Sequence, residues 1–164
     1  MTSEFVHLHN HSDYSLLDGA QQVQQLVNTI DDLNMDSLAL TEHGNMFSVV
    51  PFYQKAKKAG INPIIGCETY VAVGSRHDKK LQPGGGWGNN HLILLVQNQI
   101  GYENLMKLVT AGYLEGFYYR PRIDMDLLEK HSEGLVCLSG CLKGEIPEKM
   151  LNGDYNGARD AALK

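Results

Sequence analysis

The chain reads Leu38-Ala39-Leu40-Thr41-Glu42-His43-Gly44-Asn45 where a predicted strand ends and apolar residues lead directly into polar ones. The carboxyl ends of strands are where α/β folds place their functional residues. His43 is therefore a candidate metal ligand. For Glu42 two interpretations stay open, a carboxylate that supports a neighbouring ligand or one that is merely solvated.

Outward from this stretch, short apolar runs alternate with longer amphipathic segments, which favours βα units and a mainly parallel sheet. The predicted strands are 5–9, 37–41, 62–73, 91–97 and 135–139, and the predicted helical segments are 20–33, 47–59, 101–114, 143–151 and 154–164. The polar, glycine-rich segment between 74 and 90, including 83–88, lacks the Gly-Lys-Ser/Thr of a phosphate-binding loop. We predict that it is a mobile surface loop.

Composition narrows the class of protein. The chain has 164 residues, 43% of them hydrophobic, which is enough for one globular domain with a core. Its net charge of −5 supplies no general attraction to nucleic acid or to an anionic membrane. The longest apolar run, 92–96, is far too short to span a bilayer, and residues 1–4 lack the layout of a signal peptide. We therefore expect a cytoplasmic protein without a membrane partner.

Histidines are concentrated near the amino terminus, in His7-Leu8-His9-Asn10-His11. Alternate residues of an extended segment point the same way, so His9 and His11 can converge on one ion. A polar edge strand is the alternative, but three imidazoles side by side would repel one another when protonated. We predict that His9 and His11 are metal ligands and that His7 is a neighbouring supporting residue.

Two carboxylates are further candidates. Asp18 precedes Gly19 at a sharp turn before the first predicted helix, where it is equally well interpreted as a ligand or as the helix N-cap. Glu68 lies inside the otherwise apolar strand Ile64-Ile65-Gly66-Cys67-Glu68-Thr69-Tyr70-Val71. Because buried carboxylates are rare unless they are paired or bind a cation, we predict that Glu68 is a ligand.

Polar residues recur at the ends of later strands as well. His91 begins one apolar strand and Cys141 follows another, whereas Cys67 and Cys137 are expected to be small core residues. One His, Asp, Glu or Cys on each of several strands is how a barrel builds a multinuclear metal site. The mixture of imidazole, carboxylate and thiolate suits Zn²⁺, Mn²⁺ or Fe²⁺ better than Mg²⁺ or Ca²⁺. Such sites hydrolyse phosphoesters, and the bound ions would attract a phosphate despite the acidic net charge.

Several of these motifs resemble the polymerase and histidinol phosphatase (PHP) family of metal-dependent phosphoesterases. They are Phe5-Val6-His7-Leu8-His9-Asn10-His11-Ser12, Thr41-Glu42-His43-Gly44-Asn45 and Gly66-Cys67-Glu68-Thr69-Tyr70-Val71. Others look like the PHP domains found at the amino terminus of bacterial DNA polymerase III alpha subunits. These are Ser15-Leu16-Leu17-Asp18-Gly19, Gly101-Tyr102-Glu103-Asn104-Leu105, Tyr113-Leu114-Glu115-Gly116-Phe117-Tyr118 and Leu138-Ser139-Gly140-Cys141-Leu142.

The resemblance implies a distorted (β/α)₇ barrel with parallel strands, outer helices and about two or three divalent ions at one mouth. The ligands that it implies are His9, His11, Asp18, His43, Glu68, His91 and Cys141. In this family an intact site is associated with a 3′–5′ exonuclease in some members. The implied partners are DNA, through a full-length polymerase, and replisome subunits such as a proofreading exonuclease subunit and the sliding clamp.

The family pattern also contains a late Asp-x-His pair, which this sequence lacks. Residues 1–164 are therefore expected to be the amino-terminal part of a PHP domain, truncated before its last strands and without the polymerase domains. On this interpretation the parent is a nucleotidyltransferase that replicates DNA, and the isolated segment is inactive. A non-catalytic interaction module of the polymerase and a stand-alone PHP phosphatase remain the alternatives.

Overall fold

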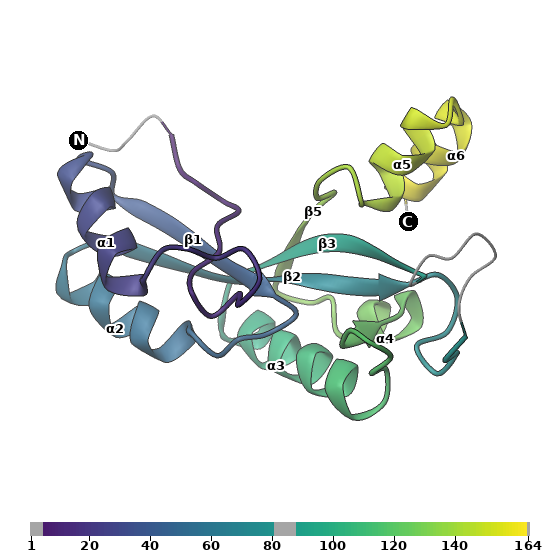
Figure 1. The fold of residues 1–164 in the computed structure, drawn as a ribbon, viewed down its shortest axis with the longest axis horizontal. Coiled ribbons are helices and arrows are strands. Elements are labelled where there is room, and N and C mark those ends of the chain that lie inside the picture. The colour runs from purple at the N-terminus through teal and green to yellow at the C-terminus, as the bar shows by residue number, and fades with distance from the viewer. Residues whose placement is uncertain (1–4, 81–87, 164) are drawn as a thin grey trace.

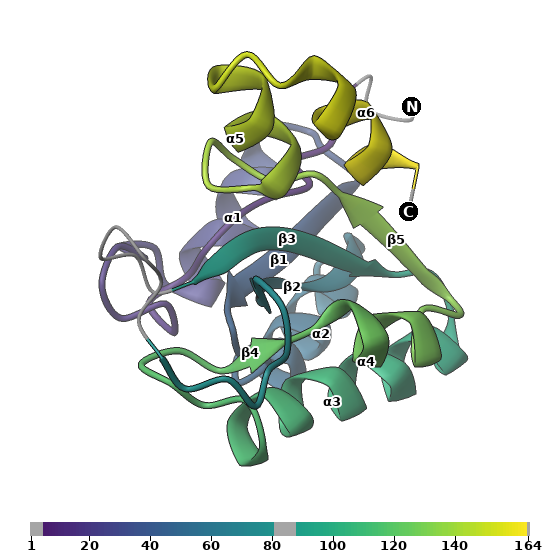
Figure 2. The ribbon, with the colours of Figure 1, turned by 90° about the vertical axis from the view of Figure 1, so that its right-hand side faces the viewer.

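A computed structural model describes residues 5–80 and 88–163, which form a five-stranded sheet with helices on both sides (Figures 1 and 2). The strands are β1 (Ser37–His43), β2 (Asn62–Ala72), β3 (Asn89–Val96), β4 (Arg122–Ile123) and β5 (Leu135–Leu138). The helices are α1 (Val23–Asp32), α2 (Val49–Lys58), α3 (Gln99–Leu114), α4 (Met125–Lys130), α5 (Glu145–Leu151) and α6 (Tyr155–Ala162). The predicted α/β class is confirmed. Residues 81–87 of the predicted mobile loop lie outside the described residues.

The strand order is β1-β2-β3-β5, with β4 paired to β2 beyond the end of β1. β1 and β4 run parallel to β2, whereas β3 runs antiparallel to both β2 and β5. Within the described sheet, β3 is thus the one strand that departs from the predicted parallel arrangement. A parallel return needs a crossover, usually through a helix, and the described residues between β2 and β3 contain none.

The predicted strand at 5–9 is wrong, because this segment has no regular ladder with its neighbour. It lies beside β1, whose Ala39 and Thr41 amides donate to the carbonyl oxygens of His7 and Asn10. The Asn10 side-chain amide donates to the Ala39 carbonyl oxygen at 3.1 Å and so occupies an acceptor that a ladder would use. The segment follows the sheet in extended but irregular form.

Two apolar clusters fix the helices to the sheet. Val27 of α1 and Phe52 of α2 are buried against Leu38 of β1, while Leu105 of α3 packs in a second cluster with Leu94 of β3. Burial of each such side chain contributes about 1.5–3 kcal/mol. The clusters therefore give the strands a firm position relative to α1, α2 and α3.

The last part of the chain packs more loosely. Helix α5 has no buried residue, and it projects with α6 away from the side of the sheet that α3 and α4 cover (Figure 2). Cys137 on β5 is exposed rather than in the core as predicted, because no described element covers that side of the strand. Among the described residues, no helix is long and apolar enough to cross a membrane.

Candidate metal centre

A single buried carboxylate, Glu68 of β2, is the centre of the site. Its side chain is 2% exposed, and it is paired in register with His43, the last residue of β1. Neighbours in register on parallel strands point to the same face of a sheet. The carboxylate and the His43 imidazole are therefore brought together by the sheet itself.

Imidazole nitrogens approach both carboxylate oxygens of Glu68. Oε2 lies 2.5 Å from His9 Nε2 and 3.3 Å from His11 Nε2. Oε1 lies 2.5 Å from His91 Nδ1 and 3.1 Å from His43 Nδ1. Residues from three separate segments thus converge on one carboxylate.

The local backbone explains how the four histidines meet. His9 and His11 alternate along the extended amino-terminal segment and face the same way, and the His11 ring stacks on His43 with centroids 3.9 Å apart. His91 lies near the start of β3. Because β3 is reversed, its start lies at the same edge of the sheet as the ends of β1 and β2.

Asp18 and Cys141 lie at two sides of this cluster. The Asp18 carboxylate oxygen Oδ2 is 2.9 Å from His43 Nε2, and the Cys141 sulfur is 3.9 Å from His91 Nδ1. Gln22, not Asp18, is the N-cap of α1, so the capping interpretation of Asp18 is wrong. Gly19 makes the tight loop possible, because a Cβ there would lie 1.7 Å from the Ser12 carbonyl oxygen.

The proximity of these groups shifts their pKa values. Burial alone would raise the pKa of Glu68, but hydrogen bonds from the four surrounding imidazoles outweigh it and hold the pKa far below its usual range. The hydrogen bond to Glu68 raises the pKa of His43 despite burial, and the hydrogen bond from His43 lowers the pKa of Asp18. The site therefore keeps an ionised carboxylate that attracts positive charge.

The donor atoms fit divalent ions. Ligand atoms of His9, His11 and Glu68 all lie within 4.8 Å of one another, so one ion can reach all three. His11 Nδ1 is buried without a hydrogen-bond partner among the described residues, so this imidazole carries an unused lone pair or proton. Imidazole nitrogen and carboxylate oxygen together suit Zn²⁺, Mn²⁺ or Fe²⁺.

The two predicted supporting residues differ. The described ring contact of His7 is with Phe5, at 4.8 Å between centroids, and not with the cluster. Glu42 is 1% exposed, which excludes the solvated interpretation. It accepts hydrogen bonds from the Ser12 amide and from three serine hydroxyls, those of Ser12, Ser15 and Ser48.

These serines are the functional residues that sequence reasoning missed. The Ser15 hydroxyl donates to Glu42 and accepts from the His43 amide at 3.1 Å, so it joins the Asp18 loop to the end of β1. Glu42 thus acts on the site indirectly, by holding the loop that carries Asp18. A buried carboxylate needs donors, but nothing in the sequence marks these serines as its partners.

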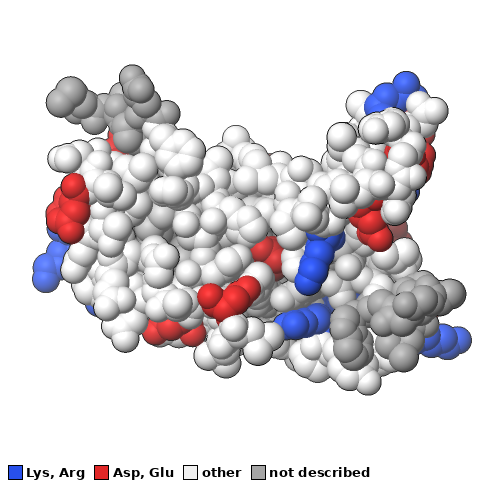
Figure 3. Space-filling view, turned by 45° about the horizontal axis from the view of Figure 1, so that its top comes forward, with Lys and Arg blue, Asp and Glu red and all other residues white. Residues whose placement is uncertain are grey.

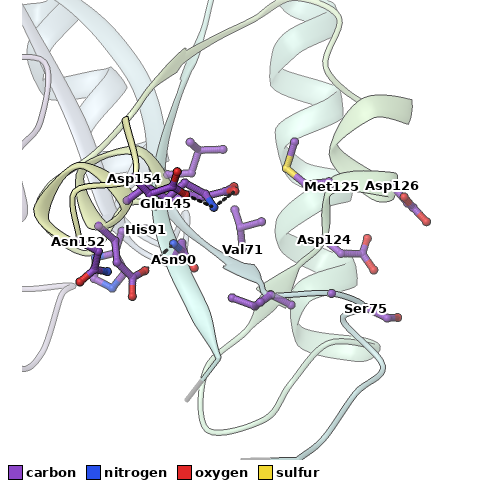
Figure 4. A pocket seen from close by; sticks show the side chains of 16 residues that line it. Val71, Ser75, Asn90, His91, Asp124, Met125, Asp126, Glu145, Asn152 and Asp154 are labelled. Atoms are coloured by element: carbon purple, nitrogen blue, oxygen red, sulfur yellow. Dashed lines mark hydrogen bonds and ion pairs between the residues drawn. The ribbon is translucent and has the colours of Figure 1, made fainter. Parts of the chain in front are cut away.

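A cavity of about 780 Å³ lies beside the cluster and includes one of its members, His91. Asp124 and Asp126 line it on the α4 side, and Glu145 and Asp154 line it on the α5–α6 side (Figure 4). Acidic and basic side chains are scattered over the hollowed face beside α5 and α6 rather than gathered by sign (Figure 3). Attraction of a polyanion would therefore rest on local groups.

Comparisons with known proteins agree with the geometry. A PHP domain model matches residues 7–164. DNA polymerase III alpha subunits of Borreliella burgdorferi and Treponema pallidum are 53% and 50% identical to this chain, each over 98% of it. The chain spans 14% of the length of either relative.

Among solved structures, the match to an amidohydrolase from Chromobacterium violaceum covers 65% of this chain and 32% of the amidohydrolase chain. The sequence identity is 23% and the TM-score is 0.46. That partial match is too distant to bear on function. The family match extends over nearly the whole sequence and includes every residue of the Glu68 cluster. The chain belongs to the PHP domain family.

Proposed function

We propose that this chain is the amino-terminal PHP segment of a bacterial DNA polymerase III alpha subunit and carries a metal-dependent phosphodiesterase site of the 3′–5′ exonuclease type. The observation that carries the proposal is the convergence of four imidazoles on Glu68, with Asp18 and Cys141 beside them. Identities of 46–53% to polymerase III alpha subunits support the choice of parent.

The ligand set forms three neighbouring groups around Glu68, which are His9 with His11, His43 with Asp18, and His91 with Cys141. His9 and His11 approach Oε2, whereas His43 and His91 approach Oε1 and extend the cluster to Asp18 and Cys141 respectively. We assign about two or three divalent ions, Zn²⁺, Mn²⁺ or Fe²⁺, to this set. When bound, such ions activate water and stabilise the leaving oxygen of a phosphodiester.

The exposure of the ligands sets the direction of approach. Glu68 is 2% exposed, whereas the side chain of Asp18 is 59% exposed. The cluster thus has a closed floor at Glu68 and is open at Asp18, beside His43. A phosphodiester would approach from that open side, with Glu68 holding the imidazoles in place beneath it.

The same proposal covers the size of the domain and its partners. Residues 1–164 would form the amino-terminal part of a larger PHP domain, which would cover apolar side chains such as Leu142 and Leu151, 71% and 70% exposed. DNA synthesis, DNA binding, the proofreading subunit and the sliding clamp would belong to the whole polypeptide.

The test uses the full-length protein that carries these residues. His9→Ala and His11→Ala are expected to lower bound Zn, Mn or Fe, measured by elemental analysis, and to abolish chelator-sensitive trimming of a 3′-labelled single strand. His77→Ala is the matched control, because His77 is 60% exposed and lies outside the cluster. Unchanged metal content in both variants would contradict the ligand assignment.

The non-catalytic alternative predicts a different combination of results. If the ions only support the structure, chelation lowers thermal stability but removes no nuclease activity. That outcome would leave the metal site standing and overturn the hydrolytic function.

A further inference from the structure

A second hollow adjoins the open side of the cluster. It has a volume of about 600 Å³ and is lined by residues from the 13–17 loop, the end of β1, the connection from β1 to α2, the end of α3 and Arg120. His43 lines this hollow and also contacts Glu68 and Asp18. We call it the aromatic groove and define it by Tyr14, His43, Phe47, Tyr113 and Arg120.

Exposed aromatic rings form one wall of the aromatic groove. Phe47 is 66% exposed, Tyr14 41% and Tyr113 38%, although such side chains stabilise a protein mainly when buried. The rings of Phe47 and Tyr113 lie 6.3 Å apart, and Tyr113 stacks on Phe117 at 6.2 Å and 28°. A contiguous exposed apolar patch of this kind marks a binding site.

Arg120 supplies a positive charge beside these rings. Its guanidinium lies 5.4 Å from the centroid of the Tyr70 ring and forms no ion pair with any described carboxylate. Tyr70 is 4% exposed and meets His91 edge-on at 5.1 Å. The arginine is thus held on a fixed platform next to the cluster, with its fork of N–H donors available to a phosphate.

Rings and a cation side by side are the two components of single-strand recognition. Bases stack on aromatic side chains whatever their identity, while a cation holds the backbone. Asp13 at the rim is a like charge to a phosphate, which leaves Arg120 as the cation that lines the groove. Stacking and charge alone favour no particular base.

We propose that the aromatic groove binds the 3′-terminal nucleotides of single-stranded DNA, with bases on Tyr113 and Phe47 and a backbone phosphate on Arg120. This proposal rests on the proposed function for one point only, which is that the bound 3′ end lies at His43 and Asp18, where the phosphodiester would be cleaved. Binding itself requires no ion.

The experiment is photocrosslinking in a chelator, so that cleavage plays no part. The full-length protein is irradiated with a short single strand that carries 5-iodouracil at its 3′ end, and the crosslinked peptide is identified by mass spectrometry. We expect crosslinks at Tyr14, Phe47 or Tyr113. At limiting protein concentration, Tyr113→Ala and Phe47→Ala each lower the yield about tenfold.

Matched variants make the result specific. Arg120→Ala is expected to lower the yield as well, and Tyr113→Phe to retain it, because stacking needs the ring and not the hydroxyl. Tyr155→Ala and Arg159→Ala are the controls, since both residues are exposed on α6. Thermal melting of each variant verifies that it is folded.

The possible outcomes separate this inference from the proposed function. Crosslinks confined to other peptides, or an undiminished yield in both Tyr113→Ala and Phe47→Ala, overturn the groove. Equal crosslinking of a blunt duplex overturns the choice of a single strand. If crosslinks form in the groove but the protein has no chelator-sensitive nuclease activity, the binding proposal is supported. Only the hydrolytic function is then overturned.

Discussion

Glu42 of β1 and Glu68 of β2 are both buried carboxylates on adjacent strands, yet their surroundings are opposite. Glu42 is held by serine hydroxyls and one amide, whereas Glu68 is surrounded by imidazoles. Glu42 pairs in register with Cys67, and Glu68 pairs with His43, so the two side chains point to opposite faces of the sheet. Neutral donors satisfy a carboxylate permanently, while imidazoles are themselves ligands that an ion can engage. Glu42 thus has the partners of a structural carboxylate, whereas the partners of Glu68 are groups that can bind an ion.

Replacement of Glu68 is the strongest test of this distinction. Glu68→Ala removes the acceptor shared by four imidazoles and is expected to weaken metal binding by at least about 100-fold. Metal content after dialysis against a weak chelator measures the effect. Glu42→Gln is the matched variant. Equal metal loss in both variants would contradict the assignment of metal binding to Glu68 alone.

Bound metal should stabilise the protein only when Glu68 is present. An ion at about 100 times its dissociation constant adds about 2.7 kcal/mol to the free energy of unfolding. Thermal melting with and without Zn²⁺ or Mn²⁺ should show this gain in the wild-type protein and no gain in Glu68→Ala. A gain of equal size in that variant would place the ion elsewhere.

Glu42→Gln should affect stability more than metal content. The amide replaces a charged acceptor with a neutral one and turns an N–H donor toward serine hydroxyls, which should cost about 2 kcal/mol. Chemical denaturation gives the free energy of unfolding. An unchanged value would mean that the serines bind Glu42 no better than water does.

Asp124 extends the comparison to a buried carboxylate that is paired with arginine. Burial would raise its pKa, but amide hydrogen bonds from Arg76 and Leu127 and the charge of Arg76, 3.0 Å away, outweigh burial and lower it. The stabilisation is therefore present above the unfolded pKa of about 3.9 and is lost as pH falls through the folded pKa.

Asp124→Asn should cost about 1 kcal/mol near neutral pH and much less at the lowest pH at which the fold persists. Urea denaturation at several pH values measures this. Asp126→Asn, in the first turn of the same helix, is the control. A penalty that does not shrink with acid would argue against the ion pair as its source.

Much of the site could be predicted because its residues conflict with their local surroundings. A carboxylate within an apolar strand singled out Glu68, and closely spaced histidines singled out His9 and His11. All seven predicted ligands lie in or beside one cluster. The metal assignment itself stays a prediction that the variants above test.

Other features left no such trace in the sequence. The direction of β3 is not encoded in its run of apolar residues, and the two residues of β4 are too few to show a period. Serine is compatible with loops, caps and helices alike, so Ser12, Ser15 and Ser48 gave no sign of their shared partner. The irregular path of residues 5–9 depends on an Asn10 side chain that bonds across to β1.

The reversed direction of β3 has a consequence for the order of folding. His91 reaches Glu68 only after β3 has been inserted against β2, and Cys141 follows only after β5 has paired with β3. Pairings between strands distant in sequence are the slow steps of folding, because each closes a long loop. The cluster would therefore be completed stepwise, with Cys141 the last of the seven groups to join it.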